Sequence, residues 1–242
     1  MNLGELELET LGIDKVKFGR VISFVDFGNV NYWYDKDQRD GEGNTLNQNQ
    51  KLIVDIEKLS KFTGLFSEEK RFYYGWNPRN KSNWHITIKA ANHGFIKITK
   101  PIQFIRHDVG NAVVSQDGRE IKEDRNGKFI EIPKGNFDVE ISVDAIRIVD
   151  RYDTLCLFSG DSDFAYLSRY LKRKGKKIIV IASGQIFHTL KEVADLYVNA
   201  QTIKGDIVTL KETSPREGRG LDIGSTSGGQ DSLRYKSKCS NY

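Results

Sequence analysis

Several aspartates of this chain follow apolar runs or begin a helical pattern, and together they have the chemistry of a divalent-metal site. Asp26 ends the run VISFV, Asp161 and Asp163 follow LCLF in the segment SGDSDF, and Asp138 begins the helical pattern before that run. In open parallel sheets, ligands bind beyond the carboxyl ends of the strands, so these side chains are expected at one sheet edge. Converging carboxylates suit Mg²⁺ or Mn²⁺, and a bound cation offsets their mutual repulsion.

Each of these aspartates also has a simpler explanation. An Asp before a helix commonly accepts hydrogen bonds from unpaired backbone N–H groups, and Asp163, which precedes a helical run, fits that role as well as it fits a metal ligand. Asp26 is more suggestive, because Gly28 and Asn29 follow it and no long helix begins there. The joint occurrence of Asp26, Asp161 and Asp163 favours the metal site over separate caps.

No other residue types form a comparable set. The histidines, which show no metal-ligand spacing, are His85, His93, His107 and His188. The two cysteines, Cys156 and Cys239, are too few for a four-cysteine zinc site or a disulfide framework. The carboxylates therefore carry the chemistry that this sequence can offer.

Alternating strands and helices are needed to bring these aspartates together. Short apolar runs predict strands at 21–25, 71–76, 95–99, 154–158, 176–183 and 196–198. Helical spacing predicts helices at 52–62, ended by Gly64, and at 82–92, 163–173 and 186–194, while the polar stretch 35–49 is expected to be a loop. This order predicts a parallel sheet between helices.

Three segments need separate treatment. Residues 137–152 alternate like a strand and also fit one helical face, and their length favours a helix. Between 102 and 132, the dipeptides Asp117-Gly118 and Asn126-Gly127 separate β-prone runs and predict an inserted β-ribbon. From residue 205 onward, Gly, Ser and charged residues dominate, which predicts a flexible tail.

Composition bounds the class of protein. The chain has 242 residues, 38% of them hydrophobic, and a formal net charge of +4. A chain of this length can bury a hydrophobic core, and the near balance of charge does not indicate a strongly basic surface for nucleic acid. No apolar run approaches the roughly 20 residues that span a bilayer, and the acidic N-terminus lacks the order of a signal peptide. We expect a soluble cytoplasmic protein, and collagen, coiled-coil, small secreted and membrane classes are excluded.

Four segments together resemble a known family. VISFVDFGNVN, KGNFDVEISVDA, LCLFSGDSDFAYLSRYLKRKGKKIIVIA and LKEVADLYVN resemble the NYN domain, the LabA-like branch of the PIN-like nuclease superfamily. The resemblance implies a Rossmann-like three-layer α/β/α sandwich with a mostly parallel sheet, here with an inserted β-hairpin. The expected organisation is an N-terminal extension (1–19), the NYN domain (20–204) with the ribbon at about 101–133, and the tail (205–242).

The resemblance also implies functional residues. Asp26, Asp138, Asp161 and Asp163 match the family's acidic positions, as catalytic residues and ligands of Mg²⁺ or Mn²⁺. Three further residues are candidates for supporting the ligands or orienting the substrate: Asn29, Asp144 and Lys134. Asp144 would lie about 120° around a helix from Asp138, so a purely structural role stays open. Lys134 is equally explained as a solvated loop lysine.

The implied activity is metal-dependent hydrolysis of RNA phosphodiester bonds. RNA is the expected partner, no membrane partner is expected, and a homodimer stays open. The aromatics Tyr32, Trp33 and Tyr34 suit either base stacking or core packing. The basic residues of 169–177 are better explained as the end of a helix, remote from the carboxylates.

Other functions are also considered. The main alternative is a catalytically weak NYN-fold regulator that binds RNA or protein, against which the complete acidic set argues. A dinucleotide-binding protein is disfavoured because no G-x-G-x-x-G follows the first strand. A phosphatase with an Asp-x-Asp motif is disfavoured because position 28 is Gly.

Overall fold

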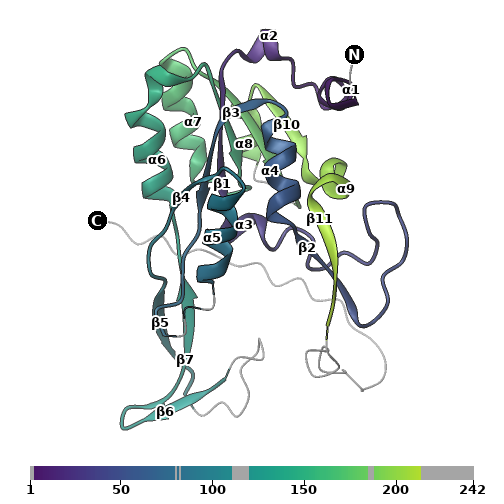
Figure 1. Ribbon diagram of the computed structural model, residues 1–242. Coiled ribbons are helices and arrows are strands. Elements are labelled where there is room, and N and C mark those ends of the chain that lie inside the picture. Colours follow the sequence, from purple (N-terminus) through teal and green to yellow (C-terminus); the bar gives the residue numbers. More distant parts are fainter. Residues whose placement is uncertain (1–2, 80, 82, 111–119, 185–187, 214–242) are drawn as a thin grey trace, which may run out of the picture.

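A six-stranded sheet, parallel throughout, forms the centre of the protein in a computed structural model (Figure 1). The structure describes residues 3–79, 81, 83–110, 120–184 and 188–213. The strands lie in the order β10-β9-β8-β1-β3-β4. Their bounds are β1 (Val21–Asp26), β3 (Ser67–Tyr73), β4 (Ile96–Ile98), β8 (Thr154–Phe158), β9 (Lys177–Ala182) and β10 (Leu196–Asn199).

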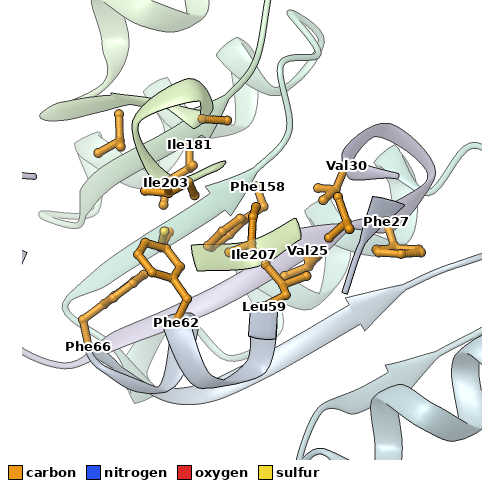
Figure 2. Close-up of a cluster of buried hydrophobic side chains, with 14 of the residues drawn as sticks. Val25, Phe27, Val30, Leu59, Phe62, Phe66, Phe158, Ile181, Ile203 and Ile207 are labelled. Carbon is orange, nitrogen blue, oxygen red and sulfur yellow. The ribbon is translucent and has the colours of Figure 1, made fainter. Parts of the chain in front are cut away.

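Helices cover both faces of this sheet because successive strand residues point to opposite sides. Val25 and Phe158 face one cluster of buried side chains, and Phe24 and Leu157 face the other. Figure 2 shows part of the first cluster, where Phe62, Ile203 and Ile207 pack over the strands. The three-layer α/β/α fold expected from the sequence is confirmed.

The helices divide between the two faces. The first face carries α1 (Leu3–Thr10), α2 (Lys15–Phe18), α3 (Phe27–Val30), α4 (Ile56–Gly64), α5 (Trp84–Asn92), the 3₁₀ helix η2 (Ala200–Ile203) and α9 (Lys204–Ile207). The second carries α6 (Asp138–Arg147), α7 (Phe164–Arg173) and α8 (His188–Val193). Residues 137–152 are thus helical, ending in a 3₁₀ turn, η1 (Val149–Arg151), as their length predicts. Among the described residues, no helix is long and apolar enough to span a bilayer.

The strand predicted at 71–76 is displaced toward the N-terminus, to Ser67–Tyr73. Two further predictions differ from the structure in the kind of element that forms. The helix expected from residue 52 begins at Ile56, because Gln50–Val54 forms a strand, β2, that pairs antiparallel with β11 (Val208–Glu212). Residues 205–212 are expected from the sequence to belong to the flexible tail, but they form most of α9 and all of β11. Both differences have one cause: the partner of β2 lies about 150 residues away, beyond the reach of local periodicity.

The inserted β-ribbon is an antiparallel three-stranded sheet that projects away from the parallel sheet (Figure 1). Its strands are β5 (Gln103–Asp108), β6 (Lys122–Asp124) and β7 (Gly127–Lys134). The predicted turn at Asn126-Gly127 joins β6 to β7, and Gly127 adopts a φ of 116° that favours glycine. The other predicted turn, Asp117-Gly118, lies outside the described residues.

The N-terminal segment before β1 packs into the first cluster. Leu8, Ile13 and Phe18 are all buried there. The carboxylate of Asp14 accepts hydrogen bonds from the backbone of Val16 and Lys17, and so caps the short helix α2. These contacts attach residues 3–19 to the amino end of the central sheet, opposite the edge where the aspartates lie.

A candidate metal centre at the carboxyl edge of the sheet

The sheet topology itself creates a crevice between β1 and β8. From β1 the chain continues to β3 and β4 on one side, and from β8 it continues to β9 and β10 on the other. The order of strands thus reverses between β1 and β8, and ligands bind at such switch points, outside the carboxyl ends of the strands. Asp26 is the last residue of β1, and the SGDSD segment follows β8 directly.

Three carboxylates from two elements converge at this crevice. Asp138, Asp161 and Asp163 each offer a ligand oxygen, and these oxygens all lie within 4.8 Å of one another. Asp138 is the first residue of α6, and the other two belong to the turn between β8 and α7. Hard oxygen donors at this spacing fit Mg²⁺ or Mn²⁺.

The local hydrogen bonds leave Asp163 available as a ligand. Asp163 occupies the position before α7, but its carboxylate makes no capping hydrogen bond to that helix. Its backbone N–H instead donates to Asp161 Oδ1 at 3.0 Å, which holds the turn closed. The alternative that Asp163 is only a helix cap is therefore not supported.

Asp26 lies beside this group and is more deeply placed. The buried Ser159 hydroxyl lies 3.2 Å from Asp26 Oδ2 and donates to it. Burial raises the pKa of Asp26 to about 6; the Ser159 and Asn29 hydrogen bonds oppose the rise, and the charges of Asp138 and Asp161 add to it. Asp26 is thus close enough for the charges of Asp138 and Asp161 to raise its pKa, although it is outside the group of three.

Asp138 is held by its own neighbours. Asn136 Nδ2 donates to Asp138 Oδ2 at 2.6 Å, and the Asp138 N–H donates to Asn136 Oδ1 at 2.8 Å. Burial raises the pKa of Asp138, with Asp161 and Asp163 contributing, and Asn136 and the nearby cation Lys100 oppose the rise. Excess negative charge therefore concentrates in this crevice, and a cation binding there would relieve it.

Asn29 connects β1 to the turn after β8. Its Oδ1 accepts from Trp33 Nε1 at 2.9 Å and from the Gly160 N–H at 3.4 Å. Because Gly160 immediately precedes Asp161, Asn29 positions the acidic turn. The contact places Asn29, which the sequence predicts near the site, beside the turn that carries Asp161.

Asp144 and Lys134 lie in different surroundings. Asp144 is buried, and it accepts from Arg71 Nη1 at 3.1 Å, from the Tyr73 hydroxyl at 3.0 Å and from Arg147 Nη2 at 2.7 Å. This network fastens α6 to β3, which favours the structural alternative for Asp144. Lys134 is the exposed last residue of β7, at the root of the ribbon.

The basic residues of 169–177 lie at the opposite end of the molecule from the carboxylates. Lys172 pairs with Asp195 at 2.8 Å, and Lys176 donates to the Tyr152 carbonyl oxygen at 2.8 Å. They surround the carboxyl end of α7 and the amino end of β9, whereas the acidic residues lie at the other edge of the sheet. Their expected remoteness from the site is confirmed.

Three contributors to the crevice were missed by sequence reasoning. Ser159 and Asn136 stand inside the quoted SGDSD and KGNFD segments, so the motifs themselves contained the signal. Lys100, which pairs with Glu140 at 2.7 Å, follows the end of β4 and so lies at the same edge. Its position after a predicted strand was the available signal.

A family model, two curated proteins and a solved structure resemble this chain. The family model of the NYN domain matches residues 20–201. The protein "Low amplitude and bright protein LabA" of Synechococcus elongatus is 30% identical over 108 residues, which cover 44% of this chain and 58% of the relative. An uncharacterized protein of Methanocaldococcus jannaschii is 39% identical over 70 residues, covering 28% of this chain and 29% of the relative.

These alignments span less than two thirds of either relative. Among solved structures, a protein of unknown function from Vibrio parahaemolyticus superposes with a TM-score of 0.52 at 23% identity, covering 79% of this chain and 97% of the other. At this identity the likeness supports the fold alone.

Proposed function

The chain belongs to the NYN domain family, whose members have a nuclease-type fold, and from this premise we propose that it is a divalent-metal-dependent ribonuclease. The observation that carries the proposal is the group formed by Asp138, Asp161 and Asp163. These carboxylates lie at the switch point of the sheet, where a nuclease needs them, and repel one another unless a cation is bound.

The donor set fits a hard cation. We assign Asp138, Asp161 and Asp163 as ligands of Mg²⁺ or Mn²⁺, with Asp26 adjoining them. A cation bound there would lower the pKa of a ligated water and stabilise negative charge on the phosphate in the transition state. No histidine or cysteine is needed for this chemistry, and Cys156 is buried in the core.

Neighbouring residues hold the carboxylates in position through hydrogen bonds. Asn136 orients Asp138, the Asp163 N–H orients Asp161, and Ser159 holds Asp26 through its hydroxyl. Fixing these oxygens before substrate binds removes reorganisation from the reaction step, which is how preorganised electrostatics accelerates a reaction. Lys100, which is paired with Glu140, lies close enough to Asp138 to oppose the rise in the pKa of that carboxyl.

The proposal is tested with purified protein and end-labelled single-stranded and hairpin RNA. We expect cleavage in Mn²⁺ or Mg²⁺, no cleavage after EDTA, and loss of cleavage in Asp161→Asn. Cleavage that both EDTA and Asp161→Asn leave unchanged would refute the metal mechanism. RNA binding without cleavage would instead support the alternative of a regulator that keeps the fold.

A further inference from the structure

A second cavity lies on the same edge of the sheet, beyond the carboxyl ends of β9 and β10. Its volume is about 620 Å³, within the range of about 300–1,000 Å³ that small-molecule sites occupy. It is lined by Tyr32, Trp33, Asp35, Lys36, Asp37, Ser183, Gly184, Asn199 and Gln201. None of these residues belongs to the acidic group, so the cavity is a separate feature of the edge.

The cavity combines an exposed aromatic ring with a firm support. Tyr32 is 63% exposed, whereas Tyr34 is buried and donates its hydroxyl to the Ala200 carbonyl oxygen at 2.7 Å. Trp33 stacks on Phe158, with ring centroids 6.4 Å apart and planes 15° apart. The turn that carries Tyr32 is therefore anchored to the core, while Tyr32 itself leaves a ring surface in solvent. An exposed ring on an anchored turn is suited to stacking.

The polar groups of the cavity have hydrogen-bonding capacity to spare. Asn199 Oδ1 accepts from the Gln201 N–H at 3.0 Å, which leaves the Asn199 amide group as a donor. Gln201 Nε2 donates to Asp37 at 3.1 Å, which leaves the Gln201 carbonyl oxygen as an acceptor. The cavity therefore offers one amide donor and one amide acceptor, which are the kinds of group that hydrogen-bond to the edge of a nucleobase.

The charges favour a neutral ligand group over a phosphate. Lys204 Nζ lies 3.1 Å from Asp37 and compensates its charge. The remaining charged side chains, Asp35 and Lys36, are exposed and of opposite sign. A phosphate would gain no net attraction here, whereas a base is uncharged and can stack and form hydrogen bonds.

Hydrogen bonds connect this cavity to the acidic crevice. Trp33 lines the cavity and donates to Asn29, which also accepts from the Gly160 N–H beside Asp161. The carboxyl ends of β8 and β10 are separated by two strand spacings, or about 10 Å. A strand of RNA with a phosphate at the carboxylates can therefore place a neighbouring nucleotide at the cavity.

We propose that this cavity binds a nucleobase of single-stranded RNA next to the bond at the acidic crevice, with Tyr32 as the stacking platform. The inference rests on the proposed ribonuclease function, because that function places the RNA backbone at the carboxylates. Stacking tolerates any base, so the subsite contributes affinity and fixes which bond is cut more than it selects sequence.

The test measures the affinity of labelled single-stranded RNA in Mn²⁺ by fluorescence anisotropy, with Asp161→Asn present in every protein to keep the RNA intact. Loss of one stacked base corresponds to a factor of about 5 to 150 in affinity. We expect Tyr32→Ala to weaken binding by a factor in this range and Tyr32→Phe, which keeps the ring, to stay within about twofold. Val16→Ala, 94% exposed on α2, is the remote control and should leave affinity unchanged.

A single abasic nucleotide, placed at each position in turn of an RNA just long enough to fill the acidic crevice and the cavity, identifies the contact. At one position the abasic nucleotide should weaken binding to the protein that keeps Tyr32. It should cause no further loss of affinity in Tyr32→Ala, since the ring and the base form one interaction. Equal affinity of Tyr32→Ala and its parent, or abasic effects that add to Tyr32→Ala at every position, would overturn the subsite. The subsite would also be overturned if nucleoside monophosphates displaced RNA at the same low concentrations at which RNA saturates the protein. The cavity would then be a site for free nucleotides.

Cleavage of the same RNA by the protein with Asp161 restored separates the two proposals. Cleavage that continues while Tyr32→Ala binds RNA normally overturns the subsite alone. Tyr32-dependent binding without cleavage in Mn²⁺ or Mg²⁺ overturns the ribonuclease and leaves the base-binding cavity standing.

Discussion

Replacing Asp26 by Asn should stabilise the metal-free protein, although it removes a proposed functional group. Asp26 has a folded-state pKa of about 6, against an ordinary value of 3.8, because burial and two neighbouring carboxylates disfavour its charge. The difference of about 2 pKa units corresponds to about 3 kcal/mol at pH 8, at about 1.4 kcal/mol for each unit. Asn keeps the shape and still accepts the hydrogen bond from Ser159.

The sign of this effect sets its pH dependence. The raised pKa means that protonated Asp26 is favoured in the folded state, and this stabilisation is fully present below pH 3.8. It is lost as the pH rises through about 6, where the folded protein must ionise a buried group. Asp26→Asn has no such titration, so the two proteins should diverge in stability between about pH 4 and pH 7.

Urea unfolding and thermal unfolding, both in EDTA at several pH values, measure the difference. At about 2–4 °C for each kcal/mol, the variant's melting temperature should rise by about 6–12 °C at pH 8. Asp144→Asn is the matched control, because it makes the same chemical change but leaves Arg71 and Arg147 without their shared partner. It should destabilise the protein, by up to about 3–5 kcal/mol. An Asp26→Asn protein that is less stable than the wild type at pH 8 would refute the reasoning.

Three further outcomes are expected. Asp163→Asn should reduce RNA cleavage at least about 100-fold and abolish the rise in melting temperature that Mn²⁺ gives the wild type, since a ligand is lost; an unchanged response to Mn²⁺ would exclude Asp163 as a ligand. Asn29→Ala should destabilise the protein by about 1–3 kcal/mol in urea unfolding, because the Gly160 N–H and Trp33 Nε1 lose their acceptor. Gly75→Ala should destabilise by about 1–3 kcal/mol, because its Cβ would lie 2.4 Å from Ile102 Cγ2 at the base of the ribbon; wild-type stability would show that Ile102 can move aside.

The central sheet could be predicted from the sequence because three of its strands, β1, β8 and β9, are short and largely apolar runs. Leu155 to Phe158 are all buried, and a strand buried on both faces shows no polar alternation to confuse with a helix. Parallel order then followed from the alternation of strands with helices. The acidic edge was predictable for the same reason, since carboxylates directly after parallel strands lie at one edge.

The remaining features depend on partners far away in sequence. The sequence assigns Leu52 to Val54 of β2 to a helix because they run into α4, and the strand that pairs with β2, β11, lies in a region of low apolar content. The family resemblance makes Asp144 a candidate for supporting the site, and its structural partner Arg71 lies 73 residues away in the sequence. Local periodicity carries no information about either contact.

The aromatic segment after the first acidic turn shows the same limit. Its sequence leaves base stacking and core packing equally open, and the structure buries some of its members and exposes others. Tyr34 is buried in the core, Trp33 is half-buried, and Tyr32 is exposed beside a cavity. The division depends on the path of the turn across the sheet edge, which is fixed by hydrogen bonds to Ser183, just after β9, and to Ala200, just after β10.

The most direct test of the metal centre is an anomalous difference map from crystals of the full chain soaked in Mn²⁺. We predict a peak between Asp138, Asp161 and Asp163, at ligand distances of about 2.0–2.3 Å, and its disappearance in Asp163→Asn crystals. An ordered crevice without a peak, in crystals of protein that cleaves RNA in Mn²⁺, would contradict the assignment of these carboxylates as the catalytic metal ligands.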